Sequence, residues 1–167
     1  MPIISIFVLM ETRVPFWPAF IATGFGSGFS PVAPGTVGAL VATVAWLSAS
    51  AVMAPAFLAM VTGFLAMVAT IVGTWATGRV QPYWGADPSR VVIDEMAGMW
   101  LALTACPHGS LGFAAGAFVL FRLFDIFKPM GIRVLDSRHG AFWVMADDLL
   151  AGAYALAVVL LTRLMMA

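Results

Sequence analysis

Apolar stretches about as long as a lipid bilayer is thick constrain the fold of this chain more than any other feature. A helix needs roughly 20 apolar residues to cross the hydrocarbon core of a bilayer. Four stretches come near that length, at 37–54, 56–78, 110–128 and 142–164. A shorter one, 94–106, can cross only if its start lies below the membrane surface. The sequence therefore predicts an all-α, polytopic membrane protein with four to five crossing helices.

Composition supports this class and excludes others. Hydrophobic residues make up 62% of the chain and charged residues 10%, whereas soluble domains carry roughly 25% charged residues. The formal net charge is zero and no basic cluster occurs, so nucleic-acid binding is not expected. Cys106 is the single cysteine, which excludes an intramolecular disulfide. The length suits one membrane-embedded domain over 1–167, and the oligomeric state is not indicated.

The N-terminal part differs from the other apolar stretches. Residues 3–29 are apolar, but Pro15 and Pro18 interrupt them, and no cationic segment precedes them as in a cleavable signal peptide. Phe16 and Trp17 suit the level of the lipid headgroups. We expect an interfacial or re-entrant segment here.

The cations indicate the orientation. When the predicted helices are traced, only Arg163 falls towards one side of the membrane. The other side carries Arg13, Arg79, Arg90, Arg122, Lys128, Arg133 and Arg138. Loops rich in Lys and Arg stay in the cytoplasm. This side is therefore predicted to be cytoplasmic.

Acidic residues on the same side lie where the membrane begins. Each carboxylate at membrane depth costs roughly 2.5–3.5 kcal/mol, so several together need cations between them. Mg²⁺ prefers carboxylate and water oxygens and fits such a cluster. The predicted metal ligands are Asp94, Glu95, Asp125, Asp147 and Asp148.

Structural explanations for these acids are also open. Asp94 and the pair at 147–148 could cap helix N-termini, and Asp125 could pair with Lys128 three residues on. Asp94 and Asp148 each have a glycine four residues later. That spacing puts each carboxylate on a helix face that another backbone can approach closely.

The segment 24–38 is rich in glycine and proline and leads into the first long helix. Backbone N–H groups of such a loop, with a helix N-terminus behind them, can hold a phosphate. Ser27, Ser30 and Thr36 supply hydroxyls. A plain tight turn is the alternative, and the segment is not a Walker A loop.

Four blocks together resemble the phosphatidylglycerophosphatase A family of bacterial enzymes. They are GFGSGFSPVAPGTVGAL at 24–40, VVIDEMAGMW at 91–100, FRLFDIFKPMGIRVLD at 121–136 and DDLLAGAYA at 147–155. Their order and spacing follow the family over roughly residues 15–155. The family's acidic motif residues fall on the five carboxylates named above, with Thr36 and Lys128 beside them.

The resemblance implies a Mg²⁺-dependent lipid phosphatase of the bacterial inner membrane, with its active site towards the cytoplasm. It would convert phosphatidylglycerophosphate to phosphatidylglycerol and inorganic phosphate. We expect catalytic roles for Asp94, Glu95, Asp125 and Asp148. We expect phosphate binding by Ser27, Thr36, Arg122 and Lys128. Attack by metal-activated water is the expected mechanism, and a covalent aspartyl-phosphate is the variant.

Other chemistries have less support in the sequence. Cys106 lacks an arginine six residues on, and His108 and His139 fall on opposite sides of the membrane, so neither a cysteine nor a paired-histidine phosphatase is indicated. His139 could transfer a proton or lie in a surface loop.

A proton- or ion-coupled transporter could use the same carboxylates, but carriers hold them near the midplane between repeats. A purely structural membrane subunit would leave them unexplained.

Overall fold

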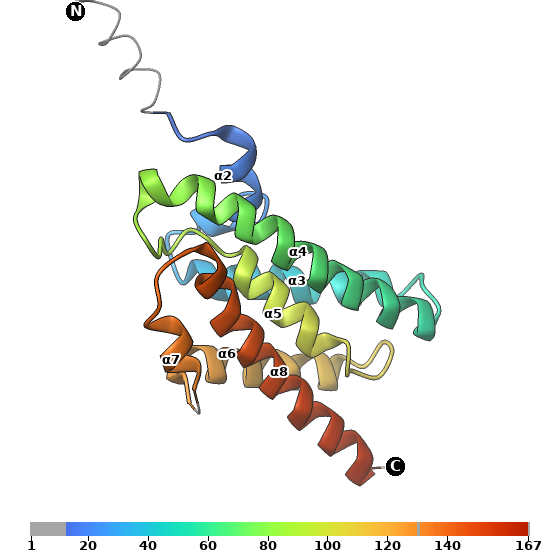
Figure 1. Ribbon diagram of the computed structural model, residues 1–167. Coiled ribbons are helices and arrows are strands. Elements are labelled where there is room, and N and C mark those ends of the chain that lie inside the picture. Colours follow the sequence, from blue (N-terminus) through green and yellow to red (C-terminus); the bar gives the residue numbers. More distant parts are fainter. Residues whose placement is uncertain (1–12, 130, 167) are drawn as a thin grey trace, which may run out of the picture.

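The computed structural model describes residues 13–129 and 131–166, and all regular structure in these residues is helical (Figure 1). The elements are α2 (Phe16–Ala22), the 3₁₀ turn η1 (Ser27–Phe29), α3 (Pro34–Ser50), α4 (Pro55–Trp84), α5 (Ile93–Leu103), α6 (Leu111–Phe127), α7 (Ile132–Asp136) and α8 (Ala141–Met166). The all-α fold class is confirmed for this part of the chain. Of the expected interfacial segment, residues 3–12 lie outside the described residues.

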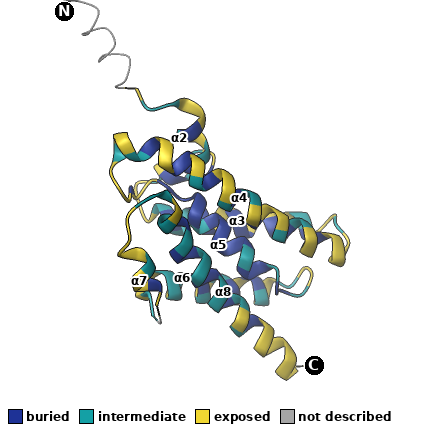
Figure 2. Ribbon diagram, viewed as in Figure 1, coloured by how far each residue is buried: buried dark blue, intermediate teal, exposed yellow. Residues whose placement is uncertain are grey.

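Helices α4 and α8 are long and apolar enough to cross a membrane, and α3 is apolar but shorter. Most residues of α4 and α8 are not buried, since only 28% and 22% of their most apolar segments lie inside the structure. Figure 2 shows exposed residues along α4 and the end of α8, and Phe64 and Ile71 of α4 are 59% and 64% exposed. Apolar surface of this extent fits lipid better than water. The chain is a membrane protein, and the count of four to five crossings stays a prediction.

Two helix ends differ from those expected. α3 ends at Ser50, earlier than the expected residue 54. α4 continues past residue 78 to Trp84, although Pro82 lies inside it. Proline removes one backbone donor, and so close to the helix end this costs a single hydrogen bond. Gly85, with a φ of 101°, ends the helix.

Pro18 does not interrupt the N-terminal segment as the sequence suggested. It lies in the first turn of α2, where backbone N–H groups have no partner within the helix. Phe16 and Trp17 of this helix are 69% and 66% exposed, and their rings contact each other edge to face. Such side chains suit the membrane interface.

The short helix α5 is the centre of the bundle (Figures 1 and 2). It packs against α3, α4, α6 and α8, and nine of its 11 residues are buried. Eleven residues at about 1.5 Å each are too short to cross a bilayer. Because its neighbours cover it, α5 need not present a full apolar length to lipid.

Helices α5 and α8 cross at two glycines. A Cβ added to Gly152 would lie 2.9 Å from the Cα of Gly98. A Cβ added to Gly98 would lie 2.7 Å from a ring carbon of Phe121 and closer still to the carbonyl oxygen of Asp148. The expectation that a backbone approaches beside Asp94 and Asp148 is therefore confirmed.

The glycine-rich segment packs against the chain that leads into α5. Val92 donates its backbone N–H to the carbonyl of Ala22 at 2.9 Å. A Cβ on Gly38 would lie 2.8 Å from the Cβ of Val92, and one on Gly28 would meet the Arg90 carbonyl. Close packing is thus one reason for the glycines of this segment, and it fixes the start of α5.

We expect Gly98→Ala to destabilise the bundle by about 1–3 kcal/mol, because the added methyl group overpacks the crossing. Gly116→Ala on α6 is the matched control, since nothing lies within 4 Å of its added Cβ. Thermal unfolding in detergent should give a lower midpoint for Gly98→Ala and an unchanged or higher one for Gly116→Ala. Equal midpoints for the two variants would contradict the close crossing.

Candidate active site

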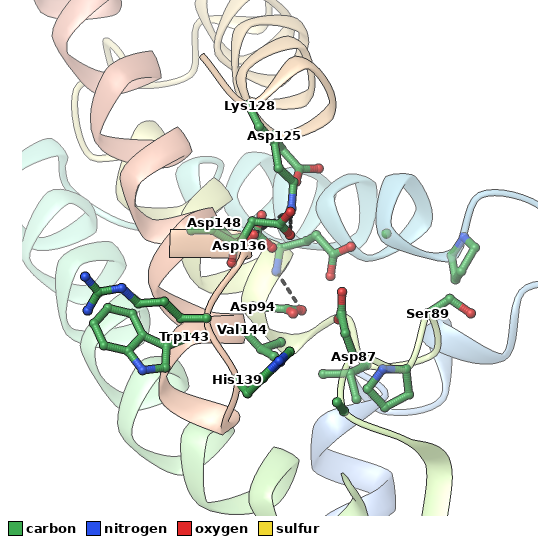
Figure 3. A pocket seen from close by; sticks show the side chains of 18 of the residues that line it. Asp87, Ser89, Asp94, Asp125, Lys128, Asp136, His139, Trp143, Val144 and Asp148 are labelled. Carbon is green, nitrogen blue, oxygen red and sulfur yellow. Dashed lines mark hydrogen bonds and ion pairs between the residues drawn. The ribbon is translucent and has the colours of Figure 1, made fainter. Parts of the chain in front are cut away.

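A cavity of about 460 Å³ opens at one end of the bundle. Its wall comes from the start of α3, the loop before α5, the first turn of α5, the end of α6, and α7 and α8 (Figure 3). Seven carboxylates and three Arg or Lys side chains line it, so negative charge is in excess. The charged lining residues are Asp87, Asp94, Glu95, Asp125, Asp136, Asp147, Asp148, Arg122, Lys128 and Arg138. We call this the acidic cavity.

All five carboxylates predicted as metal ligands line the acidic cavity. They come from three helices that meet at this end, namely the first turn of α5, the last turn of α6 and the second turn of α8. Asp94, Asp147 and Asp148 are buried, at 6%, 6% and 4% exposure. Asp125 lies 31 residues and Asp148 lies 54 residues along the chain from Asp94, so the packing of distant helices brings this acidic site together.

Helix capping does not explain the two acidic pairs. The N-cap of α5 is Val92, so Asp94 lies inside the first turn, where its Oδ1 accepts a hydrogen bond from the Glu95 N–H at 3.0 Å. The helix dipole does favour negative charge there. α8 begins six residues before Asp147, so neither Asp147 nor Asp148 is near its N-terminus. The capping interpretation is therefore wrong for Asp147 and Asp148. Asp94 is not the N-cap either, but the expected placement of Asp94 and Glu95 in a first helical turn is confirmed.

Three of the carboxylates lie close enough to share one metal ion. Oxygen atoms of Asp94, Glu95 and Asp148 lie within 4.8 Å of one another. Oxygens on opposite sides of a Mg²⁺ ion at 2.0–2.1 Å are about 4.2 Å apart, so little movement is needed. Glu95 Oε2 is buried and has no hydrogen-bond partner among the described residues. A buried acceptor without a partner is costly, and an oxygen-binding cation would satisfy it.

Arg122 lies beside this group on α6. Its Nη1 pairs with Asp125 Oδ2 at 2.6 Å, and the two side chains are 15% and 13% exposed. Its Nε is buried and has no hydrogen-bond partner in the described part of the chain. The guanidinium therefore has a donor that no described residue uses, and Arg122 lines the cavity.

Lys128 does not pair with Asp125, which was the structural alternative for that acid. Lys128 follows the end of α6 in the left-handed conformation, with a φ of 47°, so it leaves the helical face. Its Nζ instead donates to Asp147 Oδ2 at 2.7 Å and to Asp136 of α7. Lys128 thereby ties α6, α7 and α8 together and places a second cation in the acidic cavity.

Ser27 and Thr36 are not among the residues that line the acidic cavity. The Ser27 hydroxyl donates to the carbonyl of Gly24 at 2.9 Å. The start of α3 does line the cavity, through Ala33 and Gly35. First-turn amides have no partner within a helix and can bind anions. Phosphate binding by this segment stays a prediction, and the backbone of α3 is the part of it that reaches the cavity.

Gly35 also explains how α3 approaches the carboxylates. A Cβ at this position would lie 2.9 Å from Glu95 Cδ and 3.3 Å from Arg122 Nη1. No side chain fits there without moving one of them, so the α3 backbone lies directly against the acid and the guanidinium.

Sequence reasoning missed Asp87, Ser89 and Asp136, which also line the cavity. Asp87 and Ser89 lie in the loop after α4, where no sequence pattern marks them. Asp136 is the last residue of the block at 121–136, in which only Arg122, Asp125 and Lys128 were expected to act. His139 lies in an exposed loop, as expected, and lines the same cavity, whereas proton transfer by it stays a prediction. His108 is far from it, with Nε2 2.8 Å from the Met53 carbonyl.

Carboxylates that can share a divalent cation, with donors for phosphate beside them, fit a phosphohydrolase. The chain belongs to the phosphatidylglycerophosphatase A family, whose sequence profile matches residues 20–163. It is a phosphatase by this membership, and the resemblance seen in the sequence is confirmed.

Three curated relatives are similar over most of their length. A protein of Bacteroides thetaiotaomicron named putative phosphatidylinositol-3-phosphatase is 44% identical over 90% of this chain and 96% of its own. Phosphatidylglycerophosphatase A of Escherichia coli is 34% identical over 79% of this chain and 75% of its own. The Haemophilus influenzae protein of that name is 33% identical, with coverages of 83% and 84%. No solved structure matches the chain.

Divalent-cation binding should depend on the three-carboxylate group. We expect Glu95→Gln and Asp148→Asn to weaken Mn²⁺ binding, used as a probe for Mg²⁺, by at least about tenfold each. Titration calorimetry in detergent measures it without substrate. Asp136→Asn removes a carboxylate from the same cavity but not from this group, and should bind within a few-fold of wild type. Equal weakening in all three variants would mean that only overall charge matters.

Proposed function

We propose that this chain hydrolyses the phosphate monoester of phosphatidylglycerophosphate in the acidic cavity, with Mg²⁺ held by Asp94, Glu95 and Asp148. The products are phosphatidylglycerol and inorganic phosphate. One observation carries the proposal. Oxygens of these three carboxylates come within 4.8 Å of one another, beside the unpartnered Nε of Arg122. Family membership supplies the substrate class, because two relatives carry the name phosphatidylglycerophosphatase A.

Different side chains of the cavity bind the phosphate and accept the proton in this reaction. Arg122 and Lys128 bind phosphoryl oxygens, and the first-turn amides of α3 add donors. A bound Mg²⁺ would lower the pKa of a water molecule and neutralise charge on the phosphate. The water oxygen bonds to phosphorus while the bond to the glycerol oxygen breaks, and that oxygen takes up a proton. Glu95 or Asp125 accepts the proton from the water.

Asp147 has a different role in this mechanism. Its Oδ2 accepts from Lys128, while its Oδ1 is buried without a hydrogen-bond partner among the described residues. It can therefore both position Lys128 and offer an oxygen towards the cation site. We propose that Asp147 acts at the edge of the metal site, together with Asp125.

Phosphatidylinositol phosphate is the second candidate substrate. The relative with 44% identity, which aligns over 96% of its own length, is named putative phosphatidylinositol-3-phosphatase. Both lipids carry a phosphate monoester on a polyol that is linked through a phosphodiester to diacylglycerol. Phosphate release from each lipid, measured side by side in detergent with Mg²⁺, decides which one is preferred.

We propose that the acidic cavity faces the cytoplasm in the bacterial inner membrane. Arg122, Lys128 and Arg138 line the cavity, whereas Arg163, the cation assigned to the opposite side, donates to the carbonyl of Ala105 after α5. This asymmetry supports the orientation predicted from the loops. The location of the carboxylates at one end of the bundle also argues against a carrier, whose ionisable groups sit near the midplane.

The metal requirement can be tested on the wild-type protein. Chelation by EDTA should abolish phosphate release, and added Mg²⁺ should restore it, because the excess of carboxylates in the cavity needs a cation. Full turnover in chelator would remove the metal from the mechanism.

Asp125→Asn keeps the shape of the side chain and removes its charge. We expect phosphate release to fall by at least about 10²-fold, as is typical when an acid–base or metal-orienting group is lost. The fold should persist, since a neutral amide costs less than a carboxylate at this depth. Near-normal turnover with an unchanged melting temperature would reduce Asp125 to an ion-pair partner of Arg122.

The orientation can be tested with a single introduced thiol. Ser137 is exposed in the loop after α7, and the native Cys106 is buried. In spheroplasts, Ser137→Cys should react with a membrane-permeant maleimide and not with an impermeant one. Reaction with the impermeant reagent would place the acidic cavity on the outside.

A further inference from the structure

One wall of the acidic cavity has no part in the mechanism above. Asp87 and Ser89 lie in the loop between α4 and α5, are exposed, and line the cavity. Figure 3 shows Asp87 reaching from this loop towards Asp94. Neither side chain has a hydrogen bond or ion pair with another described residue. Both are therefore available to a ligand in the cavity.

The charge of Asp87 decides what kind of group it can bind. A carboxylate repels a phosphate, so the phosphate must lie on the side of Arg122 and Lys128. Asp87 is not one of the three carboxylates whose oxygens come within 4.8 Å of one another. An ionised carboxylate only accepts hydrogen bonds, and the donors in a polyol headgroup are its hydroxyls.

This inference rests on the proposed function. We propose that Asp87, with Ser89 beside it, binds the free hydroxyl on the carbon next to the phosphate-bearing carbon of the substrate. The phosphorylated glycerol of phosphatidylglycerophosphate has one such hydroxyl, and a phosphorylated inositol ring also carries free hydroxyls. Phosphatidic acid has none, because its neighbouring oxygen is acylated. The wall formed by Asp87 and Ser89 thus favours polyol phosphates over lipid phosphates that have no free hydroxyl at this position.

The selectivity should be large enough to measure. A hydrogen bond from a substrate hydroxyl to a charged acceptor corresponds to a change in kcat/KM of about tenfold to hundredfold. A site built to bind a hydroxyl also rejects the analogue that lacks it, because its polar group is then left without a partner.

The decisive experiment combines a change in the enzyme with a change in the substrate. Phosphate release is measured from phosphatidylglycerophosphate and from its analogue with hydrogen in place of the central hydroxyl. We expect wild type to lose at least about tenfold in kcat/KM on the analogue. Asp87→Ala should lose a similar factor on the natural lipid and nothing further on the analogue. Ser89→Ala should show the same pattern more weakly.

Ser137→Ala is the matched control. Its hydroxyl donates to the carbonyl of Val134, and the residue does not line the cavity. It should behave as wild type on both substrates. Phosphatidylinositol phosphate is assayed in parallel, and Asp87→Ala should also lose activity on it.

Three results would overturn the inference. Wild type could cleave the analogue as well as the natural lipid, a result that does not depend on the folding of any variant. Asp87→Ala could need a higher Mg²⁺ concentration for half-maximal activity, which would make Asp87 a metal ligand. Wild type could release no phosphate from either polyol lipid, and this outcome alone also rejects the proposed function.

Discussion

The contact between the backbones of α5 and α8 at Gly98 and Gly152 determines the rest of the structure. With no side chain at either position, the two helices lie as close as backbones allow. One turn before this crossing on α5 is Asp94, and one turn before it on α8 is Asp148. The same contact that holds the bundle together therefore brings carboxylates from both helices within reach of one ion.

Charge balance explains why such a cluster is built at the end of the bundle. Arg122 and Lys128 each pair with carboxylates in the cavity, yet Glu95 Oε2 is buried without a hydrogen-bond partner among the described residues. Burying uncompensated carboxylates costs free energy, so stability and cation binding are linked. A ligand that binds only the folded state also stabilises it. A cation bound by these carboxylates would therefore help to keep the helices together.

The curated relatives of this chain are of two kinds by name. They are named for different lipids, a phosphoglycerol and a phosphoinositide. Both headgroups present the same phosphate monoester to the carboxylates and differ in the alcohol that leaves. On our proposal, residues away from the metal site distinguish the two alcohols, and the loop that carries Asp87 and Ser89, which lines the cavity, is the wall that faces the alcohol.

The sequence by itself determined the helical class, the apolar exterior and the identity of the acids, because all three follow from local composition and period. It also indicated the close approach at Gly98 and Gly152 from their spacing to the acids. Only the tertiary structure decided which partners these groups have. Lys128 leaves the helical face through its left-handed conformation and reaches Asp147, a contact that no spacing along the chain encodes. The exposed loop of Asp87 joins the cavity for the same reason, since packing of distant helices, not local sequence, sets where its side chain lies.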